Sequence, residues 1–205
     1  MLHEISAKYG TDKYHHGFAT EYHKYFEAIR NDVKSLLEIG ILDGGSLRMW
    51  RDYFPNAEIY IIEFFEDEYR NLWQSPDTKI PNVTVISGNQ SYPSTWEEIP
   101  NVLDVVIDDG SHVPEDQIAS VELGFSKLKS KGLWFIEDTH CNFHKNYNVG
   151  GDKLYHWIMN MVVKQQIPYL STMGDFYKIQ PLLKGIEKNI FAYHLYKSMI
   201  VLEKS

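Results

Sequence analysis

The stretch SLLEIGILDGGS, residues 35–46, decides the fold. Its first five residues have the length and apolar content of a buried strand, and Gly40, Gly44 and Gly45 follow closely. Because glycine accepts positive φ angles without steric cost, these residues let the backbone turn tightly and approach a ligand. Ser46 can cap the helix that follows. The stretch therefore predicts a strand, a tight turn and a helix, the opening unit of an α/β fold.

Strand and helix patterns alternate along the rest of the chain. The predicted strands are residues 35–39, 58–63, 83–86, 103–107, 132–136, 189–194 and 198–202. The predicted helices are residues 46–54, 66–74, 95–98, 114–128 and 152–166, with a loop and a helix expected between Tyr9 and Tyr25. This alternation predicts a parallel sheet with helices on both faces, and the last two strands predict a hairpin with an antiparallel strand. We therefore expect an α/β fold with a seven-stranded, mostly parallel sheet.

Composition limits the classes of protein to which the chain can belong. We expect residues 1–205 to form a single domain, with residues 1–30 as an N-terminal flap over the active site. A net charge of -8 and scattered basic residues disfavour a nucleic-acid partner, because such binding depends on Lys and Arg. No apolar run approaches the roughly 20 residues of a membrane span. One cysteine and an N-terminus unlike a secretory signal predict a cytoplasmic protein, and a homo-oligomer is compatible with the sequence.

The carboxyl ends of the strands are the expected ligand-binding edge. Glu63 ends the second strand, where a carboxylate can accept hydrogen bonds from both hydroxyls of a ribose. The turn at residues 88–91 can supply Asn89 to an adenine ring. The G-x-x-x-G-G spacing of the first turn differs from the G-x-G-x-x-G of dinucleotide sites, so a pyrophosphate is the weaker expectation. An adenosyl ligand is one interpretation, and a structural turn with a solvated glutamate is the other.

Acidic and histidine side chains gather where the fourth and fifth strands end. The sequences there are DDGSH at residues 108–112 and EDTH at residues 137–140. Four carboxylates at one edge would repel one another unless a cation or protons compensate, and oxygen-rich ligand sets favour Mg²⁺ or another hard divalent cation. We predict Asp109, Glu137 and Asp138 as metal ligands, while helix caps and ordinary ion pairs are the alternative.

His112 follows Asp109 by three residues on the same loop. An imidazole with a pKa of about 6.5 suits general-base catalysis near neutral pH. A metal at Asp109 would lower the pKa of a bound hydroxyl and make it a better nucleophile. Asp108 can instead face the cofactor, because alternate residues near a strand end point to opposite sides.

Four segments together resemble the macrolide-sugar O-methyltransferases of the macrocin and mycinamicin types. They are KYGTDKYHHG at residues 8–17, LEIG with DGGSL at residues 37–47, DDGSH at residues 108–112 and EDTH at residues 137–140. The resemblance implies a Rossmann-like class I methyltransferase fold. It also implies a Mg²⁺-dependent transfer of a methyl group from S-adenosyl-L-methionine to a hydroxyl of a sugar or glycosylated small molecule.

The resemblance also implies roles for individual residues. Asp109, Glu137 and Asp138 would be the metal ligands, and His112 and Asp109 the catalytic residues. The expected cofactor-binding residues, which include residues of the glycine turn and of the turn after the third strand, are Glu38, Gly40, Gly44, Glu63, Asn89 and Asp108. The expected substrate-binding residues are Tyr14, His15 and His16 of the flap, together with His140.

Two other functions are compatible with these residues. A metal-dependent, hydroxylase-like oxidoreductase on the same fold would need two histidines and one carboxylate around iron, which His112, His140 and Asp109 can supply. A non-catalytic module that binds the cofactor or a sugar is the second, although such a module has no need of a base beside a metal site.

Overall fold

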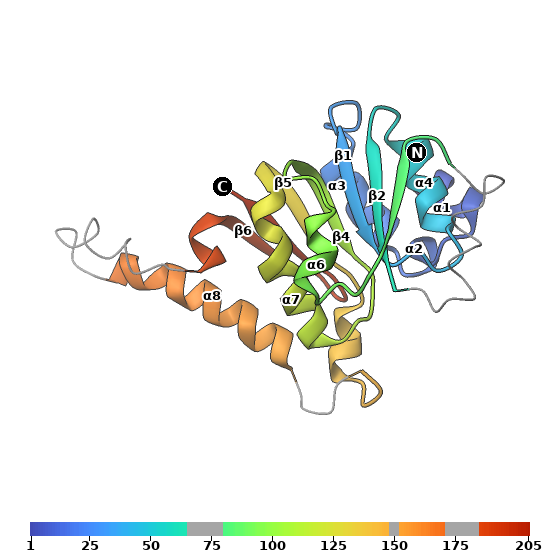
Figure 1. The fold of residues 1–205 in the computed structure, drawn as a ribbon. Helices are drawn as coiled ribbons and strands as arrows, with labels where there is room; N and C mark the ends of the chain where they lie inside the picture. The colour runs from blue at the N-terminus through green and yellow to red at the C-terminus, as the bar shows by residue number, and fades with distance from the viewer. Residues whose placement is uncertain (65–79, 148–151, 171–184) are drawn as a thin grey trace.

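The computed structural model describes residues 1–64, 80–147, 152–170 and 185–205. A seven-stranded sheet of order β3-β2-β1-β4-β5-β7-β6 runs through this part of the chain (Figure 1). The strands are β1 (Ser35–Ile39), β2 (Glu58–Glu63), β3 (Val83–Ser87), β4 (Leu103–Asp108), β5 (Leu128–Ile136), β6 (Ile190–Leu195) and β7 (Ile200–Lys204). The first five are parallel, and β7 pairs antiparallel with β5 and β6. The predicted mostly parallel sheet with an antiparallel C-terminal hairpin is confirmed.

The strand order reverses between β1 and β4. Strands β2 and β3 lie on one side of β1, whereas β4 and β5 lie on the other. At the carboxyl ends of the two central strands, Ile39 pairs with Asp108. Such a switch point is where open α/β sheets bind their ligands, because the loops that leave the two strands diverge there.

Helices cover both faces of the sheet, since residues of the central strands alternate between two apolar clusters. Leu36 and Val105 belong to one cluster, and Leu37 and Val106 to the other. The helices that contribute to the first cluster are α1 (Leu2–Tyr9), α3 (Phe18–Phe26) and α4 (Gly45–Tyr53). Those that contribute to the second are α6 (Pro93–Glu97), α7 (Pro114–Gly124) and α8 (Lys153–Leu170), which lie together in Figure 1.

The N-terminal segment is more helical than predicted. Between Tyr9 and Tyr25 we expected one loop and one helix. The structure has the end of α1, the four-residue α2 (Asp12–His15) and most of α3 there. Gly10 ends α1 with a φ of 65°, and the Thr11 side chain caps α2 by accepting a hydrogen bond from the Lys13 amide. The apolar residues that bury this segment in the first cluster are Leu2, Phe18, Ala19, Tyr22 and Phe26.

Most predicted bounds differ from the structure by a few residues, and one predicted helix lies outside the described residues. The predicted helix at residues 114–128 ends at Gly124 and continues as a 3-10 turn, η1 (Phe125–Lys127). Strand β5 therefore begins at Leu128, four residues before the predicted start at residue 132. These first residues of β5 include exposed lysines, so they lack the apolar pattern of a buried strand. The helix predicted at residues 66–74 falls among residues that are not described.

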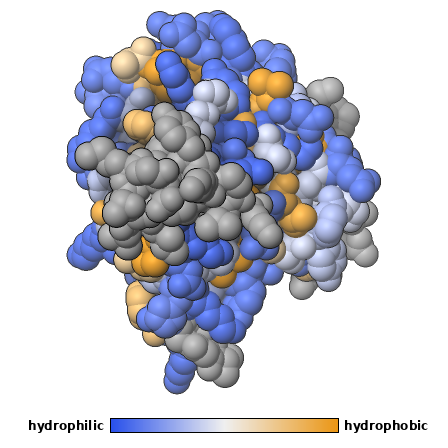
Figure 2. Space-filling view, turned by 90° about the vertical axis from the view of Figure 1, so that its left-hand side faces the viewer, coloured by the Kyte–Doolittle hydropathy of each residue, from blue (hydrophilic) through white to orange (hydrophobic). Residues whose placement is uncertain are grey.

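The face on the side of β6 and the far end of α8 carries hydrophobic surface in separate areas among hydrophilic residues (Figure 2). Large exposed apolar residues of these two elements are Met159, Val163, Phe191 and Leu195. Scattered apolar residues of this kind are normal on protein surfaces. Among the described residues, no helix has the length and apolar character to cross a membrane.

Candidate functional site

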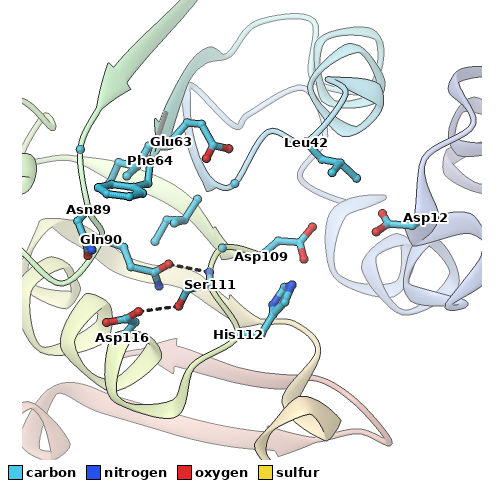
Figure 3. A pocket seen from close by; sticks show the side chains of 15 residues that line it. Asp12, Leu42, Glu63, Phe64, Asn89, Gln90, Asp109, Ser111, His112 and Asp116 are labelled. Atoms are coloured by element: carbon cyan, nitrogen blue, oxygen red, sulfur yellow. Dashed lines mark hydrogen bonds between the residues drawn. The ribbon is translucent and has the colours of Figure 1, made fainter. Parts of the chain in front are cut away.

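A cavity of about 410 Å³ opens at the switch point between β1 and β4 (Figure 3). Its walls are the ends of β1 and β2 and the turns that follow β1, β2, β3 and β4, together with Asp12 of α2 and Asp116 of α7. The volume lies within the range of small-molecule binding sites. Of the predicted site residues, those that line it are Gly40, Glu63, Asn89, Asp109 and His112.

The glycine turn and the loop after β4 approach each other closely at this cavity. Gly40 has a φ of 93°, and a side chain there would collide with the backbone carbonyl of Asp109. Glu63 holds the turn from the other side, because its Oε2 accepts a 2.7 Å hydrogen bond from the Ile41 amide. Glycine at position 40 is therefore required both by conformation and by space.

Asp108 lies behind the wall of the cavity and is not among its lining residues. The carboxylate is fully buried and accepts hydrogen bonds from Gln90 Nε2 at 3.0 and 3.1 Å and from the Ser120 hydroxyl. Gln90 Oε1 in turn accepts a 3.0 Å hydrogen bond from the Ser111 amide (Figure 3). Burial raises the pKa of Asp108 to about 7. Asp108 and Gln90 thus fix the loop that carries Asp109 and His112.

Glu38 and Gly44, also predicted as cofactor contacts, do not line this cavity. Glu38 is fully buried and accepts hydrogen bonds from the Ser46 hydroxyl at 2.9 Å and from Trp50 Nε1 at 3.0 Å. Gly44 has a φ of 77° and precedes the first residue of α4. In the structure both residues shape the glycine turn and the start of α4 from behind the cavity wall.

Asp109, His112 and Asp138 form a cluster that could hold a metal ion. Each offers one ligand atom, and the three atoms lie within 4.8 Å of one another. His112 Nε2 lies 3.9 Å from Asp138 Oδ2. Two carboxylates and an imidazole from the ends of adjacent strands match the expected convergence of these side chains.

Unpartnered atoms and strained backbone coincide at this cluster. His112 Nδ1 and Asp138 Oδ1 are buried without a hydrogen-bond partner among the described residues. His112 has a φ of 57° and Asp138 a φ of 50°, in the left-handed region. Non-glycine residues there cost about 1–3 kcal/mol each and are concentrated at functional sites. Two strained residues with free buried polar atoms indicate a site arranged for an additional ligand or proton.

Lys13, which was not predicted as a site residue, reaches the same acidic edge from α2. Its side chain is 0% exposed, and its Nζ lies 2.5 Å from Asp109 Oδ2, 2.9 Å from Glu137 Oε1 and 3.4 Å from Glu38 Oε1. Burial alone would lower the pKa of Lys13, but the three carboxylates raise it well above its ordinary value. The residue is therefore a buried ammonium ion. It belongs to the KYGTDK stretch, whose lack of apolar periodicity gave no sign of burial.

Glu137 is oriented toward Lys13 and is not part of the three-residue cluster. Its Oε1 also accepts a hydrogen bond from the Tyr22 hydroxyl. Burial and the neighbouring charge of Asp109 raise the pKa of Glu137 well above its ordinary value. Asp109 connects the two groups, since its Oδ2 bonds to Lys13 and its side chain also belongs to the cluster. The role of Glu137 as a metal ligand stays a prediction.

The four residues predicted to contact substrate lie in different places relative to the cluster. His16 Nδ1 lies 3.6 Å from Asp138 Oδ1, whereas His15 lines a smaller cavity of about 150 Å³ beside the glycine turn. Tyr14 packs its ring against His3, with centroids 4.5 Å apart. His140 Nδ1 lies 2.6 Å from the Ser198 hydroxyl and 3.7 Å from Asp138 Oδ1. Among the described residues, the two-histidine set of His112 and His140 with Asp109 does not form a three-residue cluster.

The chain is similar in sequence and in fold to known O-methyltransferases. No protein-family profile matches the chain. The chain is 27% identical over 226 residues to demethylmacrocin O-methyltransferase of Streptomyces fradiae, which covers 99% of this chain and 53% of that protein. It is 26% identical over 224 residues to mycinamicin VI 2''-O-methyltransferase of Micromonospora griseorubida, covering 99% of this chain and 52% of the relative. The chain thus spans about half the length of these curated relatives.

The fold comparison agrees with the sequence comparison. The crystal structure of the MycE methyltransferase of the mycinamycin biosynthetic pathway, in complex with Mg and SAH, superposes with a TM-score of 0.80. The match has 24% sequence identity and covers 100% of this chain and 54% of that one. The chain therefore has the Rossmann-like methyltransferase fold and is similar over almost its whole length to the macrocin- and mycinamicin-type sugar O-methyltransferases.

Proposed function

We propose that the chain is a divalent-cation-dependent O-methyltransferase that transfers the methyl group of S-adenosyl-L-methionine to a hydroxyl of a sugar or glycosylated small molecule. The observation that carries the proposal is the cluster of Asp109, His112 and Asp138 beside the cavity at the switch point. The two sugar O-methyltransferases named above support the reaction class, because their similarity covers 99% of this chain.

The cofactor would occupy the cavity at the glycine turn. Gly40 and Asp109, whose backbones touch, both line this cavity and would form the wall beside the methionine part. Glu63 uses one carboxylate oxygen on the Ile41 amide, and the other, which has no hydrogen-bond partner among the described residues, is left for ribose hydroxyls. Asn89 lines the cavity after β3 and can reach the base. Bound there, the cofactor supplies an electrophilic methyl group on a sulfonium.

The donor set fits a hard divalent cation such as Mg²⁺. Asp109 and Asp138 offer carboxylate oxygens, and Asp138 Oδ1 has no hydrogen-bond partner among the described residues. We keep Glu137 as the third predicted ligand, because it and Asp109 both accept a hydrogen bond from the Lys13 ammonium group. A cation held by these residues would increase the acidity of the acceptor hydroxyl.

His112 is the proposed general base. Its Nδ1 is buried without a partner and can accept the proton of the acceptor hydroxyl. Its Nε2 faces Asp138 Oδ2 at 3.9 Å, on the side of the ring away from Nδ1. The left-handed backbone at His112 fixes the direction of the imidazole.

The acceptor would enter beside the N-terminal segment. We propose that residues 1–205 act as one domain in which residues 1–30 form a flap, with Tyr14, His15 and His16 on its substrate-facing side. His140 would border the same entrance, because it lies 3.7 Å from Asp138. The acidic composition supports a small-molecule partner over a nucleic acid, and no apolar run has the length of a membrane span. The single cysteine supports the cytoplasm, and a homo-oligomer is compatible with the sequence.

The test is methyl transfer by the purified protein from methyl-labelled S-adenosyl-L-methionine to a panel of deoxysugar glycosides, with and without Mg²⁺. We expect labelled glycoside only with Mg²⁺. His112→Asn, which tolerates the left-handed backbone, should lower the rate at least about 100-fold while S-adenosyl-L-methionine still binds. The matched control is His156→Ala, since the His156 side chain is 75% exposed on α8. A full rate in His112→Asn would refute the assigned base, and binding without transfer across the panel would favour a non-catalytic module.

A further inference from the structure

Lys13 is a fully buried polar contact between the N-terminal segment and the sheet. The ammonium group has no exposed surface and lies within 3.4 Å of three carboxylates, from Asp109, Glu137 and Glu38. Lysine side chains are almost never fully buried unless they are paired. The partners come from the ends of β4, β5 and β1, so this single cation joins three strands of the sheet.

Three close neighbours of Lys13 in the chain lie at the site, whereas Tyr14 packs its ring against His3. Asp12 lines both the larger and the smaller cavity, and His15 lines the smaller one. His16 lies 3.6 Å from Asp138. Because α2 has only four residues, its own hydrogen bonds are too few to hold it in place. The ion pairs of Lys13 tie this turn of helix to the strand ends.

Lys13 also sets the charge of the site. The carboxylates of Asp109, Glu137 and Glu38 with the ammonium of Lys13 carry a formal charge of -2, which is three negative charges and one positive. Asp109 and Glu137 are the residues shared between Lys13 and the proposed cation. A fixed positive charge so close to these ligands weakens their attraction for a second cation and keeps them oriented.

We propose that Lys13 is a positioning residue, the resident counter-cation of the acidic site, which pins α2 over the cavity and sets the affinity for the divalent cation. The inference rests on the proposed function, since it assumes that the carboxylates bind a metal. It assigns no proton transfer to Lys13 and no contact with the acceptor.

The experiment measures Mn²⁺ binding to the full chain by electron paramagnetic resonance, without cofactor or acceptor, in the wild type and in Lys13→Met. Methionine keeps the length of the side chain and removes the charge. We expect Lys13→Met to bind Mn²⁺ at least tenfold more tightly, and the amides of residues 2–16 to exchange hydrogen at least tenfold faster. The matched control is Lys8→Met in the same segment, because Lys8 pairs with Asp52 at the surface with its side chain 60% exposed. It should change neither quantity.

A second variant separates charge from folding. Lys13→Met with Glu38→Gln restores the formal charge of -2, since it removes one positive and one negative group. It should bind Mn²⁺ within about threefold of the wild type, yet still show fast exchange of residues 2–16. If Lys13→Met does not fold, this double variant carries the test.

The outcomes distinguish the two proposals. If the wild type does not bind Mn²⁺, the proposed metal site is wrong, and the exchange rates alone decide whether Lys13 pins α2. If the wild type binds Mn²⁺ but Lys13→Met matches Lys8→Met in affinity and exchange, Lys13 has no positioning role. Unchanged exchange in the double variant contradicts the pinning in the same way.

Discussion

Replacing Gly40 by alanine tests the close approach of the turn after β1 to the loop after β4. The residue has a φ of 93°, and the added methyl group would overlap the carbonyl oxygen of Asp109 and lie 3.0 Å from its carbonyl carbon. These are backbone atoms, so no side-chain rotation can relieve the overlap. Left-handed strain of about 1–3 kcal/mol and overpacking of about 1–3 kcal/mol together predict a loss of about 2–6 kcal/mol in unfolding free energy.

The matched control for this substitution is Gly17→Ala. Gly17 also has a positive φ, 79°, but an added methyl group there would meet no atom within 4 Å. It should lose only the strain of about 1–3 kcal/mol. Urea denaturation monitored by tryptophan fluorescence gives both unfolding free energies, and titration calorimetry gives the affinity for S-adenosyl-L-methionine. We expect Gly40→Ala to be the less stable variant and to lose cofactor affinity. Equal stability of the two variants would refute the argument that the two loops touch at Gly40.

Two further substitutions test the support of the sheet ends. Gln90→Ala removes the two hydrogen bonds that Gln90 donates to the buried carboxylate of Asp108. The unfolding free energy from urea denaturation should fall by about 2–4 kcal/mol, and a fall below about 0.5 kcal/mol would contradict the role of Gln90. Asp104 lies near the amino end of β4. Burial would raise the pKa of this carboxyl, but hydrogen bonds from Lys129 and from two backbone N–H groups lower it below its ordinary value. A depressed pKa stabilises the fold above the ordinary value of 3.8 and loses that effect as pH falls through the folded-state value. The wild type should therefore exceed Asp104→Asn in urea midpoint at pH 6, with a smaller difference at pH 3, and a pH-independent difference would contradict this.

The sheet could be predicted from sequence because its strands are short apolar runs between turn signals. The bounds of β1 and β2 agree with the prediction to the residue, since Gly40 and Phe64 follow buried or half-buried strand ends. The start of β5 was missed because lysines at positions 129 and 131 interrupt the apolar pattern. A continuous apolar run predicts a strand that is covered on both faces, and residues 128–131 do not form such a run.

The candidate site was predictable in part, for a different reason. Parallel strands bring the residues after β4 and β5 to one edge, so the meeting of Asp109 with Asp138 followed from topology. The pairing of Lys13 with Glu137 joins residues 124 positions apart and depends on how α2 packs. Composition favours an exposed lysine, so no local pattern indicated this buried one.

The proposed function depends on Asp109 and Asp138 binding one divalent cation next to His112. Anomalous diffraction from a crystal soaked with Mn²⁺ and S-adenosylhomocysteine can locate this cation. We expect one manganese peak at coordination distance from oxygens of both aspartates and beside the His112 ring. A crystal that holds S-adenosylhomocysteine in the cavity but shows no manganese between these carboxylates would contradict it.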